Sequence, residues 1–337
     1  SRFEYDKDIA MLDQQSTPPV LIVGAGPIGL TAASFLHRLG IPFDLIDCKD
    51  GPVTDSRALG VHARTLEFMQ MFGLDRTFIE QGRITRYMSF HRFDKLLFKL
   101  DFNVIAKQTD FPFMLILPQS KTERILINHL EQNDCVIHWN TSFESIKLES
   151  GVNHCVIRQD NKSLNRVYRF VIAADGAGSQ IRSQLDIPFE GETYDARFLW
   201  SEANIEDNAL ARDSSHVFMG QSTTVAVLPQ PDDIYRIVGP DFQTKANGDS
   251  IVAGSDMSFT AFTDFLKRES LLSHVKIKNA SRLVNYRIHK RMAKTFQKNN
   301  VFLCGDAAHI HSPAGGQGMN TGIHDVMNLG WKIAAVV

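Results

Sequence analysis

Cysteine is scarce in this sequence, and the spacing of its cysteines matches no metal-binding or redox motif. Only four of the 337 residues are cysteine, at Cys48, Cys135, Cys155 and Cys304, and no two of them form a C-x-x-C pair. That spacing excludes a zinc ribbon, a redox dithiol and a disulfide framework, and it predicts reduced thiols.

Long apolar runs and a surplus of one charge are missing as well. No apolar run reaches the roughly 18 residues that a membrane-spanning helix needs, and no basic segment precedes an apolar one near residue 1, so we expect neither a span nor a secretory signal. A formal net charge of -2 argues against nucleic acid as a partner. The remaining composition, 43% hydrophobic and 22% charged, is typical of a globular chain with one large domain or two. We therefore expect a cytoplasmic protein that binds small ligands.

A strand, a glycine-rich turn and a helix follow one another near the start of the chain. The buried-type run at 20–23 leads into Gly24, Gly26 and Gly29, and the next predicted strand ends at Asp47. In such a unit the first glycine permits a tight turn, the second lets the backbone approach a pyrophosphate, and the third lets helix and strand pack closely. A carboxylate at the end of the second strand is placed to hold a ribose hydroxyl. The pattern predicts dinucleotide binding.

Two further glycine–acid pairs follow predicted strands. Asp175 comes after the apolar run 166–174, and Asp306 comes after VFLC near residue 304, so both lie where ligands of parallel sheets gather. A glycine-rich run then leads into a helix that we expect to begin near Gly318. His309 and His311 lack the partners of a metal-binding motif, and we predict no metal site.

The predicted elements divide the chain into two alternating kinds of segment. Helical patterns are expected at 64–72 and, from a capping-box sequence, from about Ser120. Short alternating strands dominate elsewhere. The α/β segments are 18–82, 118–185 and 295–337, the strand-rich segments are 83–117 and 186–294, and residues 1–17 form an N-terminal extension.

Three motifs in this order, VGAGPIGL, AADGAGSQIR and LCGDAAHIHSPAGGQGMNTGIHDVMNLGWK, resemble the class A flavoprotein monooxygenases. These are the FAD-dependent aromatic hydroxylases typified by para-hydroxybenzoate hydroxylase and phenol hydroxylase. The resemblance implies an α/β fold, in which a Rossmann-like and discontinuous FAD-binding domain carries an inserted, mainly antiparallel β-sheet substrate domain. The α/β segments would then bind FAD, and the strand-rich segments would bind substrate.

The resemblance also assigns the cofactor to residues of all three motifs. The expected FAD contacts are Gly24, Gly26, Gly29, Asp47, Arg57, Gln119, Asp175, Asp306, Gly316, Gly318, Met319 and Asn320. By this analogy Asp175 serves both FAD and NAD(P)H, and Asp306 holds the ribityl chain.

The same analogy places Pro313, Gly318 and Asn320 against the isoalloxazine as the catalytic positions. In this family NAD(P)H visits transiently and reduces the flavin, O2 forms a C4a-hydroperoxide, and one oxygen passes to an aromatic ring. The protein has to stabilise negative charge on the reduced flavin, for which a helix start near Gly318 is suited. It also has to keep water away from the ring.

The substrate itself is not specified beyond a small aromatic, phenolic or polyketide-like compound. Leu59 stands where phenol hydroxylase has an aspartate near its substrate. Candidates to face the ring, each with membership of the sheet core as its alternative, are Tyr194, Phe198, Phe218, Tyr235 and Phe242.

Two other functions remain open from the sequence alone. One is an FAD-binding module without turnover, and the other is an NAD-dependent dehydrogenase that uses only the first glycine motif. A homodimer is also left open.

Overall fold

The structure is a computed structural model of the chain. It describes residues 19–53, 58–206, 210–240, 259–269, 271–273, 275–311 and 315–337, with the side chains of 194–197, 240, 259 and 281–288 left out.

One of the sheets has six strands. Most of them are short apolar runs with no polar alternation, which is the pattern of strands buried on both faces. Its order is β18 (Gln297–Lys298), β19 (Val301–Leu303), β12 (Phe170–Ala173), β1 (Val20–Val23), β2 (Phe43–Ile46) and β8 (Ile137–His138). All neighbouring pairs are parallel except the antiparallel β18–β19 pair. The strands that precede the three glycine motifs, β1, β12 and β19, are therefore adjacent.

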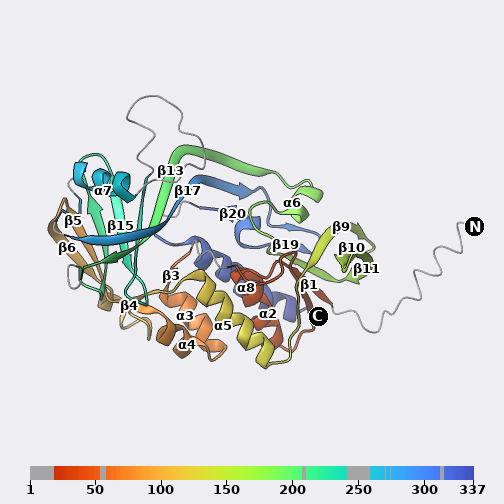
Figure 1. Cartoon of the computed structure of the whole chain (residues 1–337). Helices are drawn as coiled ribbons and strands as arrows, with labels where there is room; N and C mark the ends of the chain where they lie inside the picture. Colours follow the sequence, from red (N-terminus) through yellow and green to blue (C-terminus); the bar gives the residue numbers. More distant parts are fainter. Residues whose placement is uncertain are drawn as a thin grey trace, which may run out of the picture.

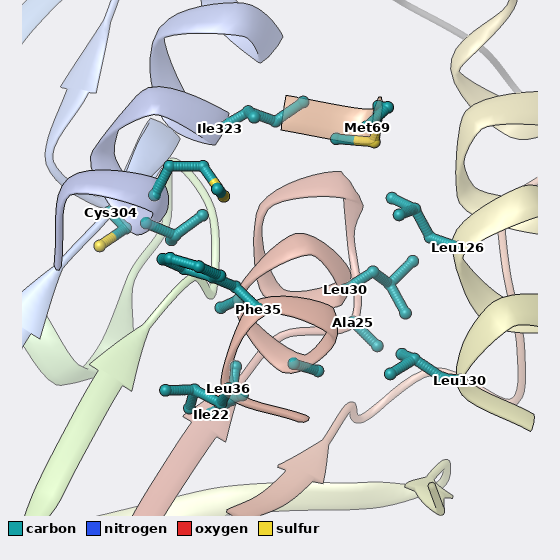
Figure 2. Close-up of a cluster of buried hydrophobic side chains, with 14 of the residues drawn as sticks. Ile22, Ala25, Leu30, Phe35, Leu36, Met69, Leu126, Leu130, Cys304 and Ile323 are labelled. Atoms are coloured by element: carbon teal, nitrogen blue, oxygen red, sulfur yellow. The ribbon is translucent and has the colours of Figure 1, made fainter. Parts of the chain in front are cut away.

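The described helices are α2 (Pro27–Arg38), α3 (Ala63–Met71), α4 (Asp75–Gln81), α5 (Gln119–Gln132), α6 (Gln180–Gln184), α7 (Phe259–Arg268) and α8 (Gly318–Ala334), with 3-10 turns η1 (Phe102–Ile105) and η3 (Gly305–Ala307). Of these, α2, α5 and α8 share an apolar core with the six-stranded sheet. Figure 2 shows Leu126 and Leu130 of α5 on one side of α2, and Ile323 of α8 on another. No described helix is both long and apolar enough to cross a lipid bilayer.

A second, eight-stranded sheet is reached through two long strands. Its order is β20 (His309–Ile310), β17 (Ile277–Ala293), β13 (Phe189–Ile205), β16 (Tyr235–Pro240), β15 (Thr224–Pro229), β14 (Ser214–Met219), β5 (Tyr87–Arg92) and β6 (Lys95–Asp101). Figure 1 shows β13 and β17 extending from the region of β19 and α6 to the part of this sheet beside α7. Only β5–β14 pairs in parallel. The sheet is thus mainly antiparallel, and the expected fold class is confirmed.

Strand register separates the two faces of the large sheet, because residues directly opposite each other share a face. One face packs its buried side chains, among them Phe218 and Ile237, with Phe262 of α7. On the other face one row crosses five strands and contains Phe90, Val217, Ala226, Val238 and Trp200. The first four are half-exposed, so this second face presents an apolar surface.

Two three-stranded antiparallel sheets complete the fold. One joins β3 (Gly60–Val61), β7 (Met114–Ile116) and β4 (Arg83–Thr85), and the other joins β11 (Lys162–Tyr168), β10 (Val152–Gln159) and β9 (Thr141–Glu149).

Two local expectations were wrong. The strand expected over 166–174 is divided at Arg169, because the Asn153 side-chain amide donates to the carbonyls of Tyr168 (3.2 Å) and Arg169 (3.0 Å) and holds a bend there. The expected capping box at Ser120 does not form. Helix α5 starts one residue earlier, at Gln119, after Pro118, whose fixed φ suits a helix entry and which offers no side-chain cap.

The helix–sheet core yields a stability prediction. Leu36 is 0% exposed, and Leu36→Ala should lower the free energy of unfolding by roughly 2–5 kcal/mol through lost burial and a residual cavity. Leu39→Ala, three residues later and 39% exposed, is the control and should change it by about 0.5 kcal/mol or less. Urea unfolding followed by circular dichroism measures both. Equal effects would contradict the assignment of Leu36 to the core.

Candidate functional site

The first glycine turn is closely packed on one side and open on the other. Gly24 has φ +104°, and a Cβ there would lie 2.3 Å from the Ala174 carbonyl oxygen. A Cβ on Gly29 would lie 1.8 Å from the Gly24 carbonyl oxygen, so helix α2 approaches β1 as closely as a side-chain-free residue allows. By contrast, a Cβ on Gly26 would meet nothing within 4 Å. The start of α2 also has no side-chain cap, so the turn offers space and positive potential that fit a phosphate.

Asp47 supports this turn from the end of β2. Its carboxylate accepts hydrogen bonds from the backbone N–H groups of Ala25 (2.7 Å) and Lys49 (2.9 Å), and the Lys49 ammonium lies 3.4 Å away. The side chain is buried, which strengthens these charge-assisted bonds. The position therefore orders the glycine turn, and its contact with a ribose stays a prediction.

The second corner follows β12. Asp175 accepts a hydrogen bond from the Ile181 N–H (3.3 Å) at the start of α6, and burial raises the pKa of its carboxyl group. Its other oxygen, Oδ1, is buried without a hydrogen-bond partner among the described residues. Since such an atom is costly to leave unsatisfied, the position fits a ligand that donates a hydrogen bond.

Arg182 ties the second corner to the third. Its guanidinium donates to the carbonyls of Ala177 (2.8 Å) and Ala307 (2.9 Å) and lies 3.8 Å from the centre of the Phe189 ring. The residue belongs to the AADGAGSQIR motif, but sequence reasoning assigned it no role. Its role could have been suspected from the sequence, because Arg182 is the only basic residue of that motif.

The third corner, after β19, packs closely against the other two. The Cys304 N–H donates to the Ala173 carbonyl (3.0 Å), which places the end of β19 beside the end of β12. A Cβ on Gly305 would lie 2.8 Å from the Ile28 side chain of α2, and so would one on Gly322 of α8. The exposed Asp306 lies in this turn. The three corners thus meet at one edge of the sheet.

Asp325 is a second residue that sequence reasoning missed at this corner. Its Oδ2 accepts the Gly305 N–H (2.9 Å) and lies 2.6 Å from Nε2 of the buried His309. His309 therefore has a structural partner. Among the described residues no group of three or more His, Cys, Asp or Glu side chains is placed to hold a metal.

Asn320 connects the glycine-rich loop to the strand β3. Its Nδ2 donates to the carbonyls of Gly60 and Gly316 (both 2.8 Å), and its Oδ1 accepts from the His62 N–H (3.0 Å) and the Thr65 hydroxyl (2.7 Å). All four hydrogen-bonding positions of this buried amide are filled. The side chain is thus a positioning group, and any contact with the cofactor would come from its backbone.

The other positions expected beside the ring differ in exposure and backbone geometry. Gly318 begins α8 with nothing within 4 Å of a Cβ position, and no side chain caps the helix. Gly316 has φ +62°, and Met319 is 7% exposed. Arg57 and Pro313 lie outside the described residues.

Gln119 lies beside the loop that leads to β3. Its side chain is 3.4 Å from the Ala58 N–H and donates to Glu123 (2.9 Å), which in turn lies 3.4 Å from the Val53 N–H. Burial raises the pKa of Glu123. Gln119 and Glu123 therefore contact the backbone N–H groups of Ala58 and Val53. The contact of Gln119 with FAD stays a prediction.

The aromatic candidates divide between the two faces of the large sheet. Phe218 and Tyr235 are buried on the α7 face, where the Tyr235 hydroxyl donates to the Leu210 carbonyl (3.1 Å). Phe198 is half-exposed and shares the opposite face with Trp200. The side chain of Tyr194 and all of Phe242 lie outside the described residues.

The bonding of Asn320 leads to a prediction about cofactor retention. Asn320→Asp replaces a donor by a carboxylate facing two carbonyls, and each buried bond lost costs about 1–3 kcal/mol. FAD affinity of the refolded protein should fall at least about tenfold, as measured by flavin fluorescence. Thr321→Val, one residue later, removes only a bond to the Gln317 carbonyl and should bind FAD normally. Unchanged affinity in Asn320→Asp would contradict the positioning role.

The Arg182 clamp can be tested with a conservative change. Lysine keeps the charge but cannot bond two carbonyls in the planar geometry of a guanidinium, so Arg182→Lys should weaken FAD binding several-fold. Arg158→Lys, at a 54% exposed ion pair with Glu144, serves as control. Titration of each apoprotein with FAD measures the effect, and equal affinities would show that the clamp does not support the site.

Comparisons with known proteins agree with this geometry. A family model described as an FAD binding domain matches residues 17–337. The chain is 35% identical over 328 residues to pentachlorophenol 4-monooxygenase of Sphingobium chlorophenolicum, covering 96% of this chain and 59% of the relative. It is 35% identical over 326 residues to 6-methylpretetramide 4-monooxygenase of Streptomyces rimosus, covering 95% and 56%. The chain therefore spans less than two thirds of the length of these relatives.

Solved structures have the same fold. The p-nitrophenol 4-monooxygenase of Pseudomonas putida superposes with a TM-score of 0.82 at 23% identity, over 95% of this chain and 80% of that one. The anhydrotetracycline hydroxylase of Streptomyces rimosus gives 0.73 at 26% identity, over 95% and 62%. Since the family model covers nearly the whole chain and the three corners converge at one sheet edge, this chain belongs to the FAD binding domain family.

Proposed function

We propose that this chain is the FAD- and substrate-binding part of a monooxygenase that uses NAD(P)H and O2 to hydroxylate a small aromatic ring. The observation that carries the proposal is the half-exposed apolar row on the large sheet, which a chain of contacts links to the glycine-rich loop. A flavin cradle alone would serve many reactions, whereas a cradle next to an apolar surface suits a flat apolar substrate.

A chain of contacts links that face to the loop. Ser215 lies two residues before Val217 in β14 and therefore shares its face. Its hydroxyl donates to the Thr85 hydroxyl of β4 (3.3 Å), and Thr85 donates to the Met114 carbonyl of β7 (3.1 Å). The Met114 sulfur lies 3.7 Å from the Cβ position of Gly60, whose carbonyl is bonded to Asn320. A ring bound between the sheet and the loop would therefore touch both.

The residues at this place have limited chemical work to do. When bound, FAD supplies the two-electron and O2 chemistry. The uncapped start of α8 at Gly318 presents backbone N–H groups and a partial positive charge to a negative ring edge. The apolar row that includes Val217 and Ala226 excludes water from the reacting centre.

Relatives support an aromatic substrate by what their names state. One acts on pentachlorophenol and another on 6-methylpretetramide, so both a small phenol and a larger polyketide occur among relatives of equal identity. We infer a phenolic or polyketide-like ring for this chain.

The test is NAD(P)H oxidation by the purified, FAD-loaded chain under air. Adding substituted phenols and a polycyclic polyketide should raise the rate at least about tenfold with one of them and give an oxygenated product by mass spectrometry. Val217→Lys, which puts a charge on the apolar face, should remove this stimulation but keep FAD bound. Gln221→Lys in the exposed turn after β14 should behave as the parent protein.

Two outcomes would reject the proposal. Bound FAD with no stimulation by any ring compound would indicate a binding module without turnover. A colourless protein that oxidises an alcohol with NAD would indicate a dehydrogenase instead.

A further inference from the structure

His62 is the one titratable side chain in the described hydrogen bonds of the loop 315–320. It follows β3 and precedes α3, and its backbone N–H donates to Asn320. Its Nε2 lies 3.2 Å from the Gly315 carbonyl. Because a carbonyl only accepts, Nε2 carries the hydrogen in the neutral ring, and Nδ1 keeps its lone pair for a proton.

The loop itself carries no compensating charge. Residues 313–320 read PAGGQGMN and contain no lysine, arginine or acid. Within the described part of this loop, a negative charge that develops on a ring lying along it would therefore meet backbone dipoles, and His62 is the titratable side chain bonded to the loop. In a partly buried site such a charge interacts more strongly with a neighbouring imidazolium than it would in water.

The surroundings of His62 keep it neutral in the absence of that charge. Burial lowers the pKa of His62, and the bond to Gly315 only partly opposes this. The titratable side chain shown to interact with His62 is His324 on α8, which is itself influenced by Arg64 on α3 and Asp325 on α8; Arg64 pairs with Glu67 (2.7 Å). Burial, followed by the charge of Arg64, lowers the pKa of His324. Asp325 is occupied by Gly305 and His309.

We propose that His62 is the charge-balancing base of the flavin site, neutral beside oxidised FAD and protonated once the bound FAD holds two electrons. The balance is simple. Two electrons and one proton convert the neutral ring to an anion, and a second proton, given up by the acid form of the buffer, forms an N–H bond at Nδ1 of His62. The inference rests on FAD lying along the loop 315–320, as in the proposed function, but it requires neither NAD(P)H nor an aromatic substrate.

The sign of the pH dependence follows from linkage. The negative ring raises the pKa of His62, so proton uptake on reduction occurs between the lowered value with oxidised FAD and the raised value with reduced FAD. Below this window His62 is protonated in both states, and above it His62 is neutral in both. Only inside the window does reduction become more favourable as the pH falls, by one extra proton for each pair of electrons.

The experiment is a spectroelectrochemical titration of the FAD-loaded chain from about pH 5.5 to 8.5, without substrate. One extra proton changes the equilibrium constant tenfold per pH unit, which for a two-electron couple is about 30 mV. The parent protein should show this additional slope over part of the range, and His62→Gln should not. His129→Gln is the matched control, because burial also lowers the pKa of His129 but its ring stacks on Phe72 and lies outside the loop contacts. It should retain the slope.

A second measurement keeps the inference testable if His62→Gln fails to hold FAD. Electrochemical reduction of the parent protein in weak buffer with a pH indicator should consume two protons per flavin inside the window and one above it. Consumption of one proton throughout, or parallel slopes for the parent and His62→Gln, would overturn the role of His62. Failure to hydroxylate any ring compound would leave these readouts unchanged and would reject only the proposed function.

Discussion

The site depends on how closely three strand ends and two helices can approach one another. Adjacent parallel strands put their carboxyl ends at the same edge, but a shared cofactor site also needs the turns that follow them to touch. At Gly29 the backbone of α2 reaches the Gly24 carbonyl, and at Gly305 and Gly322 the chain packs against Ile28. A methyl group at Gly29 would collide with the Gly24 backbone, and one at Gly305 or Gly322 would require the Ile28 side chain to move. The glycines are therefore a packing requirement before they are a binding motif.

Polar side chains then hold the corners in register. Asp47 bonds the first turn, Arg182 bridges the second and third, Asp325 holds the Gly305 N–H, and Asn320 joins the last loop to β3. Each acts mainly on backbone groups. Two of them, Asp47 and Asn320, are positions that family resemblance assigns to the cofactor. Their support of the backbone and contact with FAD are compatible, because a turn that is held rigid costs less to order on binding.

The two faces of the large sheet differ in burial. The face under α7 buries Phe218 and Tyr235, whereas the opposite face leaves Phe90 and Val217 half-exposed. An aromatic residue is therefore no guide to the substrate unless its face is known. The half-exposed row consists mostly of aliphatic side chains, Val217, Ala226 and Val238 beside Phe90, which form no directional bonds.

The sequence by itself determined the local elements and the order of the three motifs, because glycine turns, buried strand runs and amphipathic helices are encoded within a few residues. It predicted α2, α8 and the turn at Gly24 closely, and α3 within one residue. Only the tertiary structure decided which face of the large sheet is half-exposed and that the strand over 166–174 is divided at Arg169. It also decided that His62 contacts Gly315 and Asn320 of the loop. These depend on contacts between residues far apart in the chain, such as the bond from His62 to Asn320, 258 positions away. No local pattern records such a contact, because it forms only when the fold brings β3 and the start of α8 together.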